Sequence, residues 1–307
     1  MRLIHCADTA KRLLDASAVT LGSFDGIHRG HLALFRALKE LAGRHGIPAV
    51  VVTFEPHPLA VLAPEKKPAL ITSLHQKIAL IEESGIDCLA VIPFTRAFSR
   101  VDAEQFVRGY LCRALGARHV VVGHDYAFGR DRAGNCATLE SMGERCGFTV
   151  RQLEPVGEGG GIFSSTMVRR LIAGGDTVRG AEVLGRRFTV TGRVIPGAAG
   201  FRAGSFSLAT EHELLPPEGS YRVAVICGDR ALAGVCRIGE GRGMEVWLRD
   251  HLARLPLTVE LSFHERLARS SLHPAWRYQG EEALLPPPWR GGGVVPVSTL
   301  EEPCSPA

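Results

Sequence analysis

The stretch VTLGSFDGIHRGH, residues 19–31, joins an apolar segment to a glycine-rich turn and the start of an amphipathic pattern. Beyond the turn, apolar residues recur at helical spacing: Leu32, Leu34, Phe35, Leu38 and Leu41. This spacing predicts a short strand over residues 19–21 and a helix from about residue 28 towards residue 43. Strand, tight turn and helix start are typical of phosphate binding, because free N–H groups and the helix dipole there favour an anion by roughly 0.3–1 kcal/mol.

Two histidines lie in the predicted first turn of that helix. His28 and His31 are three residues apart and therefore share one helix face, and Gly30 between them would let a phosphate approach the backbone closely. The same H-x-x-H spacing also fits a metal pair or two ordinary surface histidines. Zinc takes at least three protein ligands and no third one with suitable spacing is evident, so no metal ligand is assigned. The glycines, Asp25 and the preceding strand favour a nucleotide site.

The overall composition limits the class of protein. The chain has 307 residues, 45% of them hydrophobic, which is enough for two domains with proper cores. We find no apolar run near the ~20 residues of a membrane span and no long apolar segment at residues 1–8, so we expect a cytoplasmic protein without a membrane partner. A net charge of +4 suits small anionic substrates and does not indicate nucleic acid. The eight cysteines form no C-x-x-C pair, and we expect buried free thiols.

Apolar segments alternate with helical patterns up to about residue 155. The segments that we expect to be strands are residues 19–21, 49–54, 88–94, 119–123 and 148–153. Ser73 and Gln76 form a capping box at the start of one intervening helix, and Asp102 caps another. This alternation predicts an α/β domain with a parallel sheet and helices on both of its faces.

The unusual polar clusters of this half all follow expected strands. Asp25, His28 and His31 come after the first strand, residues 54–58 after the second, and residues 123–130 after the fourth. A glycine-rich span, residues 157–161, follows the fifth strand and leads to the sequence SSTMVR at residues 164–169. Ligands of parallel sheets lie beyond the carboxyl ends of the strands, so we expect these clusters to converge on one edge.

Two of these clusters permit a structural as well as a functional interpretation. The hydroxyl groups at residues 164–166 can cap the helix that starts there. Alternatively, they can form a second phosphate site together with Arg169, whose guanidinium group binds phosphate oxygens in a bidentate manner. His57, between two prolines, is either a turn residue or a ligand contact.

Five ordered motifs within residues 15–185 resemble the bacterial bifunctional riboflavin kinase/FAD synthetase family. They are GSFDGIHRGH at residues 22–31, TFEPHP at 53–58, the aromatic residues 94, 98 and 106, VGHDYAFG at 122–129, and SSTMVR at 164–169. The resemblance implies a Rossmann-like nucleotidyltransferase domain over residues 1–185. It also implies transfer of AMP from ATP to FMN, giving FAD and pyrophosphate, with Mg²⁺ accompanying the ATP and both substrates small molecules.

The resemblance also implies roles for individual residues. His28 and His31 would stabilise the α- and β-phosphates, and Arg169 would bind the pyrophosphate as the third catalytic residue. The other residues implied to bind ATP are Gly22, Phe24, Asp25, Gly30, Gly123, His124, Asp125, Ser164, Ser165 and Thr166. Those implied to bind the flavin are Phe54, His57, Pro58 and Phe128. His124 stands where the family usually has an acidic or amide residue.

The pattern changes after residue 185. Five further segments read as strands joined by short turns: residues 188–195, 221–227, 232–238, 244–248 and 257–263. Gly228 and Asp229 form a candidate hairpin turn, and a small closed antiparallel β-barrel is the natural outcome. We expect this barrel over residues 186–280, in the position of the family's riboflavin kinase domain, followed by a loose Pro/Gly-rich tail over residues 281–307.

The barrel departs from the family in its expected kinase site. The family has a G-F-P-T-A-N segment whose Thr and Asn hold the metal and nucleotide, whereas this chain has GSFSLA at residues 204–209. Ser207 can replace the Thr, but Ala209 offers no oxygen where the Asn should be, and Mg²⁺ needs oxygen ligands. Glu245 matches the family's base. The tyrosine-glycine pair before the last strand and the long C-terminal helix of the family are also missing.

These observations leave several functions open. The favoured one is an FMN adenylyltransferase with a degenerate kinase-like barrel, and the alternative is an intact bifunctional enzyme that uses Ser207 and Glu245. A non-catalytic flavin or nucleotide binder and a transferase for another phosphate remain further alternatives, since H-x-G-H is shared with other AMP and CMP transferases. The sequence gives no indication of the oligomeric state.

Overall fold

The computed structural model describes residues 1–6, 11–196, 205–249 and 256–268 of the chain, which form two compact units. The first unit comprises Met1–Gly174, Arg179–Arg186 and His212–Leu214. The second comprises Gly175–Val178, Arg187–Glu211 and Leu215–Ala307. The expected Pro/Gly-rich tail, residues 281–307, lies outside the described residues.

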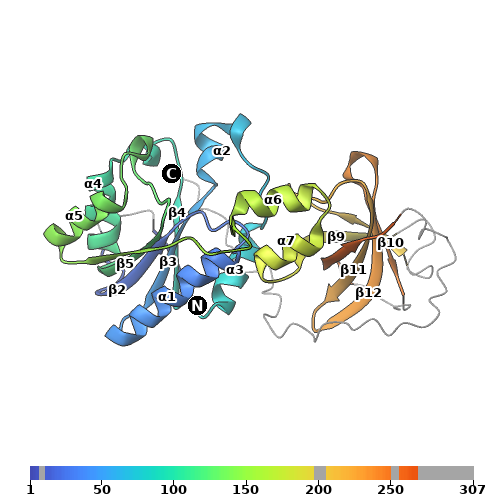
Figure 1. The fold of residues 1–307 in the computed structure, drawn as a ribbon, viewed down its shortest axis with the longest axis horizontal. Helices are drawn as coiled ribbons and strands as arrows, with labels where there is room; N and C mark the ends of the chain where they lie inside the picture. Colours follow the sequence, from blue (N-terminus) through green and yellow to red (C-terminus); the bar gives the residue numbers. More distant parts are fainter. Residues whose placement is uncertain (7–10, 197–204, 250–255, 269–307) are drawn as a thin grey trace, which may run out of the picture. The chain divides into compact units, whose positions relative to one another are not determined.

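A six-stranded sheet forms the centre of the first unit (Figure 1). Its strands are β1 Arg2–His5, β2 Ser17–Leu21, β3 Ala49–Glu55, β4 Cys88–Pro93, β5 Ala117–Gly123 and β6 Thr149–Leu153. All neighbours pair in parallel, in the order β1-β4-β3-β2-β5-β6. β2 therefore lies between β3 and β5, and the chain winds outward from it in both directions, so the loops after β2 and β5 meet at the point where ligands bind in such sheets.

Helices cover both faces of this sheet, as the sequence predicts. The longer helices of the chain are α1 Arg29–His45, α3 Leu74–Glu83, the adjoining α4 Ala103–Phe106 and η3 Val107–Ala114, α5 Cys136–Cys146, α6 Ser165–Ala173 and α7 Thr177–Leu184. On one face, α1 and α3 bury Phe35, Leu38 and Ile81 in one apolar core. On the other, α4, η3 and α5 bury a second core that includes Leu111 and Leu139. Alternate residues of each strand supply the two cores, which is the reason for the continuous apolar runs of the strands.

Short elements complete the first unit. They are α2 Pro58–Leu62, η1 Pro64–Lys66, η2 Phe98–Arg100, η4 Arg130–Arg132 and the hairpin of β7 Gly157–Glu158 with β8 Gly161–Ile162. The predicted capping box at Ser73 and the predicted cap at Asp102 are both present. β1 is absent from the sequence prediction, because its four residues bury only Ile4 at the edge of the sheet and carry too short a pattern to be recognised.

The second unit is a closed antiparallel barrel, as the sequence predicts, with one more strand than expected. Its strands are β9 Phe188–Pro196, β10 Ser205–Ala209, β11 Gly219–Cys227, β12 Arg230–Ile238, β13 Met244–Leu248 and β14 Thr258–Arg266, with η6 Glu240–Arg242 before β13. They close in the order β10-β13-β12-β11-β14-β9. Gly228 and Asp229 form the two-residue turn between β11 and β12, as predicted. The missed strand is β10, whose alternation of buried Phe206 and Leu208 with more exposed residues is an ordinary strand signal.

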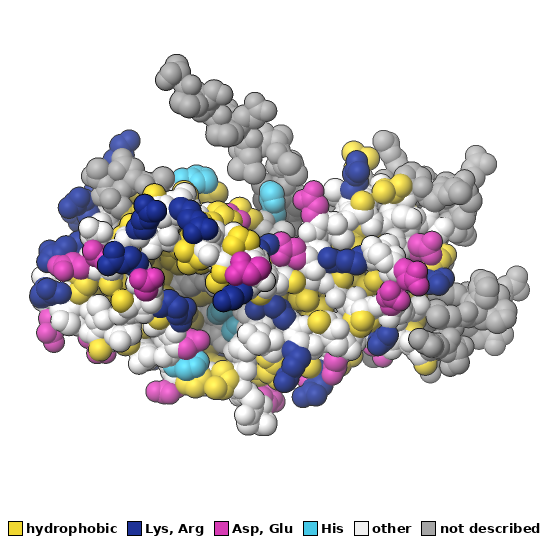
Figure 2. All heavy atoms as spheres, turned by 90° about the horizontal axis from the view of Figure 1, so that it is seen from above, with side chains coloured by type: hydrophobic (Ala, Val, Ile, Leu, Met, Phe, Trp, Pro, Cys, Tyr) yellow, Lys and Arg dark blue, Asp and Glu magenta, His cyan; other side chains and the backbone are white. Residues whose placement is uncertain are grey.

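The remaining general expectations concern thiols, charge and membranes. All seven cysteines in the described residues are free, and three of them are buried. Figure 2 shows basic and acidic side chains interspersed on the face in view, in accord with the mild net charge of +4. In the part of the chain that the structure describes, no helix is both long and apolar enough to span a membrane.

Candidate active site

The loop after β2 has an unusual backbone. Phe24 and Ile27 adopt positive φ values of 45° and 40°, although both carry large side chains, and these side chains are almost fully buried. Gly26 has φ 85°, and a Cβ there would lie 2.9 Å from the Ile71 side chain. Such conformations persist only where the surroundings enforce them, and they concentrate at functional sites. The packing of Phe24 and Ile27 therefore fixes the path of the chain into α1.

His28 and His31 come together at the start of α1, as the sequence predicts. Their rings stack with centroids 3.7 Å apart and planes 25° apart, and the Phe24 ring packs edge-on against His31 at 5.2 Å. Gly30 gives room for this arrangement, since a Cβ there would lie 3.1 Å from the His28 ring. The Nδ1 atoms of both histidines are buried and have no hydrogen-bond partner among the described residues. Buried polar atoms without a partner are rare and call for one.

Both imidazoles are neutral at pH 7. Burial, reinforced by the positive charge of Arg186, lowers the pKa of His28 to about 4. Burial also lowers the pKa of His31 well below its ordinary value, with further contributions from His28, Lys77 and Arg186. The pair therefore offers hydrogen-bonding nitrogens rather than fixed positive charge, and the cations of the site lie on other residues.

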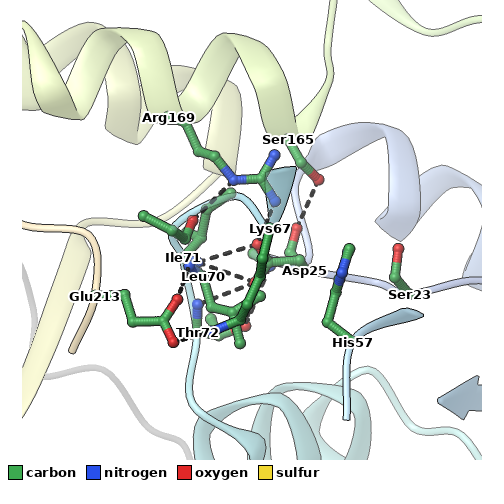
Figure 3. Close-up of polar contacts among 12 residues, drawn as sticks. Ser23, Asp25, His57, Lys67, Leu70, Ile71, Thr72, Ser165, Arg169 and Glu213 are labelled. Carbon is green, nitrogen blue, oxygen red and sulfur yellow. Dashed lines mark hydrogen bonds and ion pairs between the residues drawn. The ribbon is translucent and has the colours of Figure 1, made fainter. Parts of the chain in front are cut away.

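Asp25 is the centre of a hydrogen-bond network at this site (Figure 3). Its carboxylate is 2% exposed and accepts bonds from the amide of Ile71, from the amide and hydroxyl of Thr72, and from Arg169 Nη2 at 2.6 Å. Its backbone carbonyl accepts a bond from Ser165 Oγ at 2.8 Å. Asp25 thus joins the loop after β2 to two distant segments, the loop before α3 and the start of α6.

The SSTMVR segment forms the first turn of α6. Ser164 caps the helix by accepting a bond from the Met167 amide, which confirms the structural interpretation of this residue. Thr166 is exposed. Arg169 donates from Nε to the carbonyl of Ala69 and from Nη2 to Asp25, so its fork is held while its remaining N–H groups stay available. The binding of pyrophosphate by this segment stays a prediction.

A segment from far along the sequence completes the first unit beside this network. Glu213 forms an ion pair with Lys67 and accepts a bond from the Leu70 amide (Figure 3). Burial acts to raise the pKa of Glu213, but the bonds from Lys67 and Leu70 outweigh it and lower the pKa. Glu213 therefore holds the loop that carries Ile71 and Thr72 to Asp25. Sequence analysis does not find it, because Glu213 lies between two barrel strands.

The end of β3 and the start of α2 carry three residues predicted to bind flavin. Phe54 packs against Phe94 and Phe98, with ring centroids about 6 Å away. His57 caps α2 through Nδ1, which accepts from the Leu59 amide, and Pro58 is the first residue of that helix. Burial lowers the pKa of His57, and the charges of Asp25 and Arg169 act on it with opposite signs. His57 thus lies within electrostatic reach of the Asp25 network, but its contact with flavin stays a prediction.

The loop after β5 divides into an exposed part and a buried part. His124 and Asp125 are exposed. The charge of Asp125 acts to raise the pKa of His28, so this loop lies within electrostatic reach of the histidine pair. Gly123 ends β5 at the same edge. Phe128 is 7% exposed and stacks on Tyr126 within the core, so here its ring supports the loop. Gly22 follows β2, where a Cβ would lie 3.0 Å from the Phe24 ring.

Two cations at this site are missed by the sequence analysis. Arg186 donates to the Ile27 carbonyl at 3.1 Å, and its charge lowers the pKa of both imidazoles. Lys77 lies in α3, is only 6% exposed, and also acts on His31. A signal for Lys77 exists in the sequence: it stands four residues before the buried Ile81, on the apolar face of its helix.

The barrel brings two predicted kinase residues together. Ser207 and Glu245 are directly paired across β10 and β13. Phe206, Leu208, Met244 and Val246 on these strands point into the barrel, so Ser207 and Glu245 face outward together. Ala209 follows on the same face and pairs with Arg193 on β9.

The described residues contain no group of three or more His, Cys, Asp or Glu side chains that could form a metal cage. Asp25 is already saturated by its protein partners, whereas Asp125 is exposed beside His28. Mg²⁺ commonly binds through substrate phosphates and only one or two carboxylates. The residues present therefore fit an ion that arrives with a nucleotide, and Asp125 is the exposed carboxylate that would be available to it.

Comparison with known proteins places the chain in a family. The FAD synthetase family model matches residues 10–167. The bifunctional riboflavin kinase/FMN adenylyltransferase of Escherichia coli K12 is 34% identical over 270 residues, covering 87% of this chain and 85% of that protein. Its counterpart from Pseudomonas fluorescens is 34% identical over 277 residues, covering 86% and 87%. A crystal structure from Streptococcus pneumoniae, named as a macrolide-efflux protein, superposes with a TM-score of 0.77 at 25% identity, covering 87% of this chain and 91% of that one.

The fold, the ordered motifs and these relatives agree. The chain belongs to the FAD synthetase family, among the bacterial bifunctional riboflavin kinase/FMN adenylyltransferases.

Proposed function

We propose that this chain transfers AMP from ATP to FMN, giving FAD and pyrophosphate, and that its barrel has lost riboflavin kinase activity. The observation that carries the first part is the stacked pair of His28 and His31, whose buried Nδ1 atoms lack partners at the start of α1. This pair lies at the edge of the sheet where a nucleotide would bind, beside a held arginine. The family membership supports the same reaction.

The chemistry of the transfer suits the residues present. An ionised oxygen of the FMN phosphate attacks the α-phosphorus of ATP, and the bond from that phosphorus to the oxygen bridging to the β-phosphate breaks. Pyrophosphate leaves with the electron pair. Because the nucleophile is already ionised at neutral pH, no general base is needed, and catalysis consists of alignment and charge stabilisation.

Each part of the site has a task in this reaction. The two imidazoles act as neutral hydrogen-bond donors to the α- and β-phosphate oxygens, and the free amides of the first turn of α1 support them. Arg169, oriented by Asp25, directs its remaining N–H groups to the departing pyrophosphate, with Ser164, Ser165 and Thr166 at the same helix start. Asp25 itself acts as the residue that positions Arg169, because its oxygens are taken up by the protein.

The metal enters only with the nucleotide. Mg²⁺, when bound, neutralises charge on the phosphate chain, and Asp125 is the residue that would hold it. Gly22, Phe24, Gly30, Gly123 and His124 line the nucleotide in this proposal. Phe54, His57 and Pro58 form the flavin side, with Phe128 behind the loop.

The loss of kinase activity rests on Ala209. The outward face of β10 and β13 offers a hydroxyl at Ser207 and a carboxylate at Glu245, but Ala209 contributes no oxygen. A hard cation needs several oxygen ligands at fixed positions, so we infer that this face cannot hold Mg²⁺ and a nucleotide together.

An intact bifunctional enzyme is the second candidate. The direct pairing of Ser207 with Glu245 favours it, since a base and a metal-binding hydroxyl would lie side by side. The names of the relatives point in the same direction.

One experiment separates these candidates. The purified protein is incubated with ATP and Mg²⁺, once with FMN and once with riboflavin, and the flavins are resolved by chromatography. We expect FAD from FMN and neither FMN nor FAD from riboflavin. Product from riboflavin would establish the bifunctional enzyme, and the absence of FAD from FMN would refute the adenylyltransferase. A further variant, Glu245→Gln, should leave FAD formation from FMN unchanged.

A further inference from the structure

Lys77 is almost entirely buried, and the described residues give its ammonium group no partner. It lies in the first turns of α3, and 6% of the residue is exposed. Among the residues that the structure describes, none forms a hydrogen bond or an ion pair with its ammonium group. Lys39 on α1, by contrast, is exposed and donates to the Ser84 carbonyl at 2.8 Å. Lysine is almost never buried without a partner, because the loss of hydration is not repaid.

The surroundings of Lys77 come from two loops of the candidate site. The carboxylates of Asp25, after β2, and Glu55, at the end of β3, both raise the pKa of Lys77. The effect of burial is larger, so the pKa is lowered. The charge of Lys77 in turn lowers the pKa of His31, which follows β2, and that of His57, which follows β3. The ammonium group is therefore within electrostatic reach of both the histidine pair and the segment from Phe54, in β3, to Pro58, at the start of α2.

The position of α3 is fixed independently of Lys77. Ser73 and Gln76 close the capping box at its start, and Thr72, just before it, binds Asp25 through its amide and its hydroxyl. Lys77 follows one turn later, on the face that buries Ile81. The helix is thus anchored to the Asp25 network by other residues, and the fold does not need a charge at position 77.

We propose that Lys77 is a substrate-binding residue whose ammonium group pairs with a phosphate of the reacting substrates, where the two phosphorylated molecules meet. A phosphate is the anion that this site handles, and lysine binds it as a compact point charge. The inference rests on the proposed function for the identity of the substrates, and it adds to the site a cation that does not depend on Asp25 for its orientation. The phosphate belongs either to the chain of ATP or to FMN.

The test compares Lys77→Met with wild type and with Lys39→Met, which removes the same charge from the surface. Affinities for ATP, adenosine, FMN and riboflavin are measured by calorimetry, and each phosphorylated ligand is compared with its counterpart without phosphate. Turnover is measured separately with ATP and FMN. Thermal unfolding provides the control for folding, and Lys77→Met should melt at or above the wild-type temperature because it removes an uncompensated charge.

We expect Lys77→Met to weaken the binding of ATP or of FMN at least tenfold while the affinity for adenosine and riboflavin changes less than twofold. Weakened ATP binding assigns the ATP chain, and weakened FMN binding assigns the flavin phosphate. Wild-type affinity for both in the folded variant would overturn the inference, as would a wild-type protein that prefers neither phosphorylated ligand. A wild-type protein that makes no FAD refutes the proposed function instead, and the binding measurements on Lys77→Met still decide this inference.

Discussion

The candidate site of the first unit and the outer face of the barrel differ in how their residues are held. In the first unit, Asp25 alone binds Ile71, Thr72 and Arg169, and Ser165 binds the Asp25 carbonyl. On the barrel, Ser207 and Glu245 are neighbours only through strand register, and their side chains bind no other side chain among the described residues. Contacts between distant segments therefore fix the residues of the first site, whereas strand register alone brings Ser207 and Glu245 together.

The largest expected effect follows from removing the charge at the centre of the first site. Asp25→Asn leaves Arg169 without its counter-ion in a mostly buried position, which should lower the free energy of unfolding by about 3 kcal/mol. AMP transfer should fall more than 100-fold because Arg169 loses its orientation. Urea unfolding and FAD formation measure the two effects.

A matched control exists at Asp87, which accepts a bond from the Ala49 amide outside the site. Asp87→Asn should leave turnover unchanged. If Asp25→Asn behaves like Asp87→Asn, the network around Asp25 has no function beyond local packing.

The second prediction concerns the histidine pair. His31→Ala removes the ring that stacks on His28, and we expect the turnover of AMP transfer to fall at least tenfold with little change in melting temperature. His45→Ala, at the other end of α1, removes a ring that packs 4.1 Å from His119 and should have no such effect. Equal turnover in wild type and His31→Ala would remove the imidazole from the mechanism.

The third prediction concerns the stability of the folded protein at low pH. The pKa of His28 is about 4 in the folded chain and about 6.5 when unfolded. As the pH falls between these values, the unfolded chain binds a proton that the folded one does not, so stability decreases by up to about 3 kcal/mol by pH 4.

Urea unfolding between pH 7 and pH 4 measures this dependence in wild type and in His28→Asn. The variant cannot take up that proton and should lose less stability on acidification. An identical pH slope for both proteins would mean that His28 is not buried as a neutral ring.

The smallest effect is expected at Glu213. Glu213→Gln weakens the contact with Lys67, and because both groups are partly exposed, the free energy of unfolding should change by about 1 kcal/mol or less. The KM for ATP or FMN should rise about two- to threefold as the loop of Ile71 and Thr72 loosens, an estimate that follows from the same small energy. Glu240→Gln, on an exposed turn of the barrel, should change neither quantity. Equal KM values in both variants would mean that Glu213 has no effect on substrate binding.

The sequence predicts the parts of the fold that depend on local pattern. The alternation of apolar segments with amphipathic ones predicts five of the six sheet strands and the helices on both faces, because period and capping are local properties. The short edge strand β1 escapes detection for lack of pattern. β10 is missed because residues 204–209 occupy the place of the family's metal-binding segment, although Phe206 and Leu208 alternate as in a strand.

The site was only partly predictable for a different reason. The rule that ligand loops follow parallel strands brings Asp25, His28 and Arg169 into one region from the sequence alone. The neutral state of the imidazoles, the burial of Lys77 and the bond from the Leu70 amide to Glu213 depend on tertiary packing between segments up to 159 residues apart. No local pattern encodes such contacts.

The most direct test of the central claim is the structure of the protein with a non-hydrolysable ATP analogue. We expect oxygens of the phosphate chain within hydrogen-bond distance of His28 and His31, and the fork of Arg169 still held by Asp25 while it contacts the terminal phosphates. A phosphate chain bound elsewhere, with both Nδ1 atoms still without partners, would contradict the account.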